Sequence, residues 1–243
     1  MIDWHDEGIV LSRRRHGESA ALVEVFTAAR GRCAGIVPGG AGRRAAPTLM
    51  AGNQVAIRWR ARLAEHLGTL TAEPLRARAA AVLDDPARLA ALGAAAALLA
   101  AALPERDPHP ALYARSVALL DALAAGVAGW PATYLGWELA LLADLGFGLD
   151  LGTCALSGTT EDLAYISPRT GRAVARAAAG EWADKLLPFP PCLTGAPPAG
   201  AADLAAGLRV TGHFLARHLP GGEAGRPLPA ERGRLADILA RQG

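Results

Sequence analysis

The side chains of this 243-residue chain that point to a function are arginines, and they are concentrated near the N-terminus. Between Gly8 and Ala64 ten arginines stand against two acids, Glu18 and Glu24, so this segment carries a net charge of +8. From Arg76 onward, 15 basic and 16 acidic residues nearly cancel. Positive charge concentrated on a small domain suits a polyanion, because each neutralised phosphate releases counterions. The pattern predicts a nucleic-acid partner for the N-terminal part of the chain.

One group of candidate DNA contacts alternates with apolar residues. Three of the even positions of the segment 53–63 are arginine, Arg58, Arg60 and Arg62, and the odd positions from 55 on are apolar. Because successive side chains of a strand point to opposite faces, we expect the three to form a stripe on the solvent face. The scarcity of balancing acids argues against an ordinary solvated surface, on which both signs of charge are mixed. The residues expected to fill the interior are Val55, Ile57, Trp59 and Leu63.

Two further groups of arginines are expected in connections between strands. Arg43 and Arg44 follow a glycine-rich stretch whose backbone could approach a phosphate closely. Arg13, Arg14 and Arg15 are expected in the first connection, another place where small barrels contact nucleic acid. Aromatic residues are scarce in this region, so we expect phosphate contacts to dominate over base stacking, with little sequence preference.

Several kinds of chemistry lack a signature in the sequence. The segment 38–44 lacks the Lys-Ser/Thr ending of a phosphate-binding P-loop, and no serine-hydrolase or zinc-protease motif occurs. The cysteines Cys33, Cys154 and Cys192 are odd in number and widely spaced, which favours a reducing compartment over a disulfide framework. The longest apolar run, 89–103, is too short to span a bilayer. We expect a non-enzymatic, soluble, cytoplasmic protein with no membrane partner.

Alternating hydrophobicity predicts five short strands at the start of the chain. Five strands in about 70 residues, with one long connection before the fourth, favour a small closed barrel, an OB-fold first and an SH3-like barrel second. The predicted strands are Gly8–Arg13, Ala20–Thr27, Gly31–Val37, Asn53–Leu63 and His66–Glu73.

The rest of the chain shows helical periodicity, with prolines near the starts of the segments. The predicted class is therefore α+β, with a barrel domain over 1–75 and a helical domain over 76–243. The predicted helices are Pro86–Leu103, Pro110–Val127, Pro131–Leu145, Asp203–His218 and Pro229–Arg241.

Three stretches together resemble the RecO family of bacterial DNA repair and recombination mediators. They are residues 6–18, which open with Asp-Glu-Gly-Ile-Val-Leu-Ser, residues 52–69, and residues 137–151. The resemblance extends over most of 1–185. It implies an N-terminal OB-fold, a helical domain, and often a small zinc-binding insertion. It also implies binding to single- and double-stranded DNA, annealing of complementary strands, and association with the nucleoid.

The resemblance implies protein partners as well. Family members bind RecR and the acidic tail of single-stranded DNA-binding protein (SSB), and they help RecA load onto SSB-coated DNA. We expect the phenylalanine at the end of such a tail to insert between apolar helices while its carboxylates pair with Arg115 or Arg209. Two other hypotheses remain open: an RNA-binding OB-fold protein, and a scaffold whose arginines recognise only an acidic protein.

The chain departs from the family pattern at the zinc site, where relatives that bind zinc carry two C-x2-C pairs. The corresponding positions here are Cys154, Ser157, Ala175 and Ala178. Zinc requires four N, S or O ligands, and alanine offers none. We therefore expect no zinc and no other cofactor. The insertion, 150–180, is expected to keep a hairpin of Leu163–Ile166, a turn at 167–171 and a second strand over 172–174, held by packing.

Overall fold

A computed structural model describes residues 1–63, 66–219 and 227–241. Contacts divide the chain into two compact units. The first comprises Met1–Ala128 with Pro229–Leu235, and the second comprises Gly129–Leu228 with Ala236–Gly243. The domain boundary expected at residue 75 stays a prediction.

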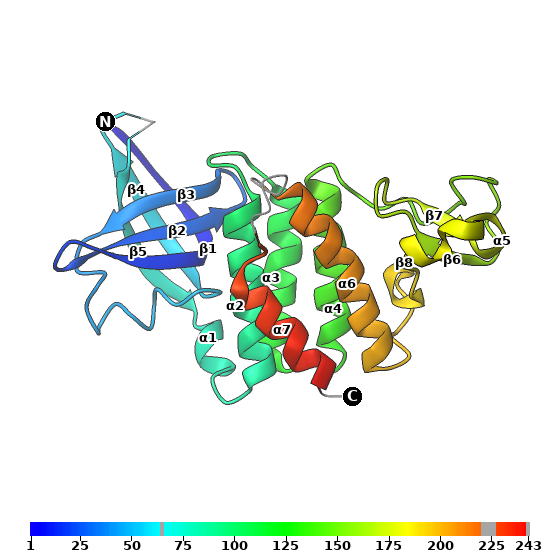
Figure 1. Cartoon of the computed structure of the whole chain (residues 1–243). Coiled ribbons are helices and arrows are strands. Elements are labelled where there is room, and N and C mark those ends of the chain that lie inside the picture. The colour runs from blue at the N-terminus through cyan, green and yellow to red at the C-terminus, as the bar shows by residue number, and fades with distance from the viewer. Residues whose placement is uncertain (64–65, 220–226, 242–243) are drawn as a thin grey trace. The chain divides into compact units, whose positions relative to one another are not determined.

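The first unit begins with a closed five-stranded barrel (Figure 1). The strand order is β1-β2-β3-β5-β4, and every neighbouring pair is antiparallel except β3 and β5. This arrangement confirms the predicted OB-fold and the α+β class. The strands are β1 (Ile2–His16), β2 (Ala20–Thr27), β3 (Gly31–Val37), β4 (Gln54–Ala61) and β5 (Gly68–Arg76).

Strand β1 is much longer than the predicted Gly8–Arg13. Its first half, Ile2–Ile9, pairs with β4, and its second half, Gly8–His16, pairs with β2. The three arginines at 13–15 therefore lie in the strand, and their expected place in a connection was wrong. Charged residues at both ends have low strand propensity, but pairing with two neighbours overrides that local preference. A bulge between Val10 and Ser12 separates the two halves.

The barrel interior is filled by the apolar face of each strand. Val55, Ile57 and Trp59 are at most 4% exposed, as predicted, and each fully buried apolar side chain stabilises the fold by about 1.5–3 kcal/mol. The prediction for Leu63 was wrong: it is 47% exposed, because β4 ends at Ala61 and the alternation stops there.

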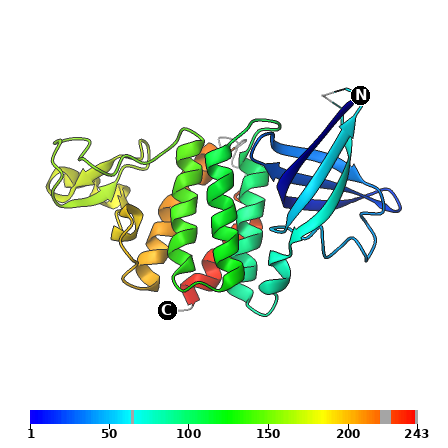
Figure 2. The ribbon, with the colours of Figure 1, turned by 180° about the vertical axis from the view of Figure 1, so that it is seen from behind.

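Three helices complete the described part of the first unit's main segment: α1 (Arg78–Ala81), α2 (Pro86–Ala102) and α3 (Pro110–Ala125). Asp85 caps α2 by accepting the N–H groups of Ala87 and Arg88. Helices α2 and α3 pack against each other (Figure 2). None of the helices in the described ranges is both long and apolar enough to cross a membrane.

The buried guanidinium of Arg78 links the barrel to α3. Arg78 is 2% exposed and donates to Asp121 of α3 at 2.7 Å and to Gln54 of β4 at 2.7 Å. Next to it, the N–H of Ala79 donates to the side chain of Asn53. These bonds satisfy polar groups that would otherwise be buried without partners, so they also hold β4 in place against the helices.

The second unit combines helices with a small three-stranded sheet of order β7-β6-β8. The predicted hairpin is confirmed as β6 and β7, whereas β8 and the short helices carried no sequence signal. Helices α4 and α6 are joined by a hydrogen bond from the Thr211 hydroxyl to Glu138. The elements are α4 (Trp130–Asp144), β6 (Leu163–Ile166), β7 (Ala173–Ala175), α5 (Arg176–Ala179), η1 (Gly180–Lys185), β8 (Leu187–Pro188), η2 (Pro191–Thr194) and α6 (Ala201–His218); α7 (Ala230–Arg241) has residues in both units.

Replacing Arg78 with methionine should lower the free energy of unfolding by roughly 2–4 kcal/mol, because Asp121, Gln54 and the carbonyl of Gly52 lose a buried donor. Arg76→Ala is the matched control: its guanidinium lies 3.4 Å from the same Asp121 but is 63% exposed, so its loss should cost less than about 1 kcal/mol. Urea unfolding followed by circular dichroism measures both variants, and equal losses would show that the buried network does not stabilise the fold.

Candidate nucleic-acid interface

The predicted stripe on β4 is partly neutralised by the neighbouring strand. Arg58 and Arg60 lie on the outer face of β4, where the register sets β1 against them. One carboxylate oxygen of Asp3 lies 2.5 Å from Nη2 of Arg58 and 3.4 Å from Nε of Arg60. The hydrogen bond from Arg58 lowers the pKa of Asp3, so this acid remains charged near neutral pH. Arg62 follows the end of the strand and is exposed.

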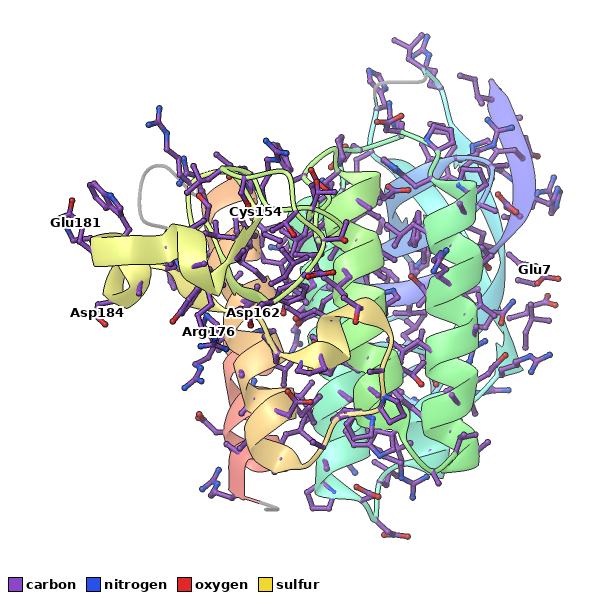
Figure 3. All side chains as sticks on the ribbon, turned by 90° about the vertical axis from the view of Figure 1, so that its right-hand side faces the viewer. Glu7, Cys154, Asp162, Arg176, Glu181 and Asp184 are labelled. Carbon is purple, nitrogen blue, oxygen red and sulfur yellow. The ribbon has the colours of Figure 1, made fainter. Side chains whose placement is uncertain are left out.

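The charge of the whole barrel is smaller than that of its arginine-rich segment. Residues 1–7, which pair with β4, add three acids, and the net charge over 1–76 is +4. Glu7, labelled in Figure 3, points away from β1, and its carboxylate accepts a hydrogen bond from Gln54 at 2.9 Å. The net charge of +8 over Gly8–Ala64 does not include these acids, which precede that segment in the sequence. The strand register brings them beside the arginines of β4.

A second group of arginines gathers where the β1–β2 hairpin meets the loop after β3. Nε of Arg13 donates to the carbonyl of Gly40 at 2.8 Å, and the N–H of Ala41 donates to the carbonyl of Ser19 at 3.0 Å. These two bonds bring the loop to the hairpin. We call the group the hairpin cluster, and its members are Arg13, Arg14, Arg15, Arg43 and Arg44.

The hairpin cluster has little local compensation. Arg14 is 68% exposed on its side chain and lies 3.8 Å from Glu24, which binds Arg32 more closely at 2.7 Å. Arg15 donates to the backbone carbonyls of Gly17 and Glu18 and is exposed. Arg43 and Arg44 are exposed and form no ion pair with any residue in the described ranges. Their guanidinium groups are therefore available to a polyanion.

Arg32, which was counted with the positive segment, has a structural role. Its guanidinium is 17% exposed, pairs with Glu24 and donates from Nε to the carbonyl of Leu103 at 2.8 Å. These bonds tie β3 to the end of α2. Arg32 is thus not part of the open positive surface.

The two arginines predicted to bind an acidic tail lie in different units. Arg115 is exposed on α3 of the first unit, and Arg209 is exposed on α6 of the second. They are therefore two separate candidates, and both stay predictions.

Comparison with known proteins gives a full-length match. Residues 1–78 match the family model described as Recombination protein O N terminal, and residues 83–227 match Recombination protein O C terminal. The chain belongs to the RecO family. The DNA repair protein RecO of Cereibacter sphaeroides (strain ATCC 17025 / ATH 2.4.3) is 57% identical over 241 residues, which cover 99% of this chain and 100% of the relative. The DNA repair protein RecO of Jannaschia sp. (strain CCS1) is 54% identical, with 99% and 98% covered. Membership of the RecO family places the chain in DNA repair and recombination.

The four insertion positions predicted to correspond to a zinc site contain a single sulfur, that of Cys154. Cys154, labelled in Figure 3, is 1% exposed and accepts the N–H groups of Ser157 at 3.4 Å and Ala175 at 3.3 Å. Ala178 packs against the same apolar cluster. The four positions matched from sequence therefore do converge. Across the described ranges, no three His, Cys, Asp or Glu side chains come together as a metal site.

Cys154 should titrate as an acidic thiol. The N–H of Ala175, followed by the hydroxyl and N–H of Ser157, lowers the pKa of Cys154 to about 6, whereas burial raises the pKa of Cys33 and Cys192 to about 11. Thiolate absorbance at neutral pH should thus come from Cys154 alone and disappear in Cys154→Ser. Because its folded pKa lies below the unfolded value, its contribution to stability is full above about pH 9 and is lost as the pH falls through 6.

Metal analysis of the same purified protein tests the second expectation, which is that the chain binds no zinc. One equivalent of zinc that disappears in Cys154→Ser would contradict this expectation. A thiol titrating near pH 9 would show that the backbone donors do not act on the sulfur.

Proposed function

We propose that this RecO family member is a non-enzymatic recombination mediator that binds single- and double-stranded DNA without sequence preference. In this proposal it anneals complementary strands and, together with RecR, helps RecA load onto SSB-coated DNA. Family membership supports the role in repair and recombination, and the barrel's charge supports the DNA contact.

The observation that carries the DNA-binding proposal is the hairpin cluster. Its five arginines come from two segments joined by the Arg13–Gly40 hydrogen bond, and Arg14, Arg15, Arg43 and Arg44 are exposed. Arginine binds phosphate oxygens through two parallel N–H bonds, which gives affinity for the backbone without reading base edges. A phosphate backbone along this end of the barrel needs no particular sequence.

Changing Arg14, Arg15, Arg43 and Arg44 to alanine should weaken single-stranded DNA binding and flatten its salt dependence. The slope of log K against log salt should fall by up to ~0.7 for each phosphate that the variant no longer neutralises. The comparison variant is Arg58→Ala, Arg60→Ala, Arg62→Ala. It should flatten the slope less, because Asp3 already neutralises part of the stripe. If the stripe variant flattened the salt slope more than the hairpin-cluster variant, the main DNA contact would be on β4 and this prediction would be wrong.

The reciprocal variant in the same titration is Asp3→Asn. It removes the acid between Arg58 and Arg60, so binding at about 50 mM salt should strengthen severalfold, with the gain screened away near 1 M.

Two outcomes of these binding experiments would favour other functions. Preference for structured RNA by an order of magnitude would support an RNA-binding protein, and no DNA binding at about 50 mM salt would support a scaffold for an acidic protein.

The proposed protein partners can be tested on the full chain. We expect a labelled acidic peptide that ends in phenylalanine, the chemistry of the SSB tail, to lose affinity when Arg115 or Arg209 is changed to alanine. Removal of one charge-assisted pair should weaken binding by about tenfold to a hundredfold. Fluorescence anisotropy measures this, with Arg234→Ala as a control because Arg234 pairs with Glu231 of its own helix. Unchanged affinity in both variants would remove them from the tail site.

A further inference from the structure

A pocket with two tryptophans opens beside the start of β1. The cavity, about 290 Å³, is bounded by the first residues of β1, the turn between β2 and β3, and the loop between α2 and α3. Its size is near the lower limit for small-molecule sites, so it accommodates one ring system rather than a folded segment. The residues that give it chemical character are Trp4, Trp59, Arg30, Arg106 and Cys33.

The two indole rings form a stacked pair. The ring centroids of Trp4 and Trp59 are 5.6 Å apart, with 19° between the ring planes. Trp59 is 4% exposed and donates from its indole nitrogen to the carbonyl of Ala34 at 2.9 Å. A Cβ at Gly68 would lie 2.3 Å from the same ring, so only glycine lets β5 pass there. The indole ring of Trp59 is therefore held rigidly in place, and the half-buried ring of Trp4 stacks on it.

Two arginines lie over these rings. The guanidinium carbon of Arg30 is 4.9 Å from the ring centroid of Trp4, and that of Arg106 is 5.8 Å from that of Trp59. Both arginines are exposed, and neither forms an ion pair with a carboxylate in the described ranges. Burial raises the pKa of Cys33 to about 11, so the thiol in the pocket is neutral. The pocket thus combines apolar ring faces with two exposed guanidinium groups that have no direct carboxylate partner in the described ranges.

The loop between α2 and α3, which carries Arg106, packs against the barrel. The N–H of Arg106 donates to the carbonyl of Arg32 at 2.8 Å, and Arg106 has a left-handed backbone with φ of 62°. A Cβ at Gly31 would lie 1.9 Å from the carbonyl oxygen of Asp107. The loop therefore packs directly on the turn between β2 and β3, which sets the position of Arg106 before any ligand arrives.

We propose that this pocket takes one unstacked nucleobase of single-stranded DNA, with the base stacked on Trp4 and its flanking phosphates bound by Arg30 and Arg106. The inference rests on the DNA binding proposed above. Every base has a π-face, so stacking of this kind tolerates any sequence. Arginine contributes both phosphate contacts and cation–π attraction. The base would take the place over Trp4 that Arg30 occupies in the free protein.

A nucleic acid matches the surroundings of the pocket better than an aromatic peptide does. Arg30 lies in the turn between β2 and β3 and Arg106 in the loop between α2 and α3, and each guanidinium lies over one of the two stacked indole rings, so the phosphates on either side of one base can each meet an arginine. A DNA strand offers a phosphate on each side of every base, whereas the carboxylates of an acidic peptide have no fixed place on both sides of its aromatic ring. The repeated positive charge fits the repeated phosphate.

The test compares short single strands that differ only in their bases. The full chain is titrated with a fully abasic strand and with the same strand bearing one central thymine. The thymine should raise affinity at least about fivefold, and Trp4→Ala should abolish this gain without changing the salt slope. Trp4→Phe should keep part of the gain. Trp182→Ala is the matched control, because Trp182 is 57% exposed in the second unit and should keep all of it.

The outcomes separate this inference from the proposed function. Equal binding of the two strands by the unaltered protein would overturn the base pocket while leaving DNA binding intact, and this comparison needs no variant. Binding of neither strand at about 50 mM salt would overturn the proposed function itself. If an acidic peptide ending in phenylalanine lost affinity in Trp4→Ala while the thymine effect persisted, the pocket would be a peptide site, and the inference would be wrong.

Discussion

The pairing of β1 with two different neighbours is the constraint on which the rest of the barrel depends. One half of the strand forms hydrogen bonds with β4 and the other with β2, and this double pairing closes the sheet. Closure buries the apolar faces of all five strands in one core, and it removes the open edges that a flat five-stranded sheet would expose. It also decides which charged side chains meet, since each residue of β1 acquires a fixed partner across the strand.

This register divides the arginines into groups with different roles. At one end of β1, Asp3 faces Arg58 and Arg60 and reduces their positive potential. At the other end, Arg13, Arg14 and Arg15 extend beside the loop that carries Arg43 and Arg44. A third group is structural: Arg32 and Arg78 bind buried or half-buried partners and join the barrel to helices. Formal charge along the sequence is therefore a poor measure of potential at the surface, because nearby opposite charges cancel within a few ångströms.

Much of the fold followed from local patterns. The bounds of β2 and β3 agree with the predicted strands, because each is a short alternating run between turn residues. The proline-led helices α2 and α3 also begin where predicted. What local patterns could not supply was the partner of each strand. The contact between Asp3 and Arg58 joins residues 55 positions apart, and only the β1–β4 register brings them together.

The sequence predicted only part of the candidate site, because local patterns do not show which distant residues come into contact. The arginines at 43 and 44 are exposed as the glycine-rich loop suggested, and the hydrogen bond between Arg13 and Gly40 explains why they lie near the hairpin. Trp59 was correctly placed in the core, yet its contact with Trp4 was not foreseen, because Trp4 precedes the first predicted strand. Arg106 lies in a connection with no distinctive motif. Its place over Trp59 depends on how that loop packs against Gly31.

The central claim is that the open positive surface lies at the hairpin end of β1, next to the loop after β3. Amide hydrogen exchange, measured with and without single-stranded DNA, tests this claim most directly. We predict that DNA slows exchange at residues 17–19 and 43–44, which are exposed in the free protein. Unchanged exchange in both segments, with protection confined to the second unit, would contradict it.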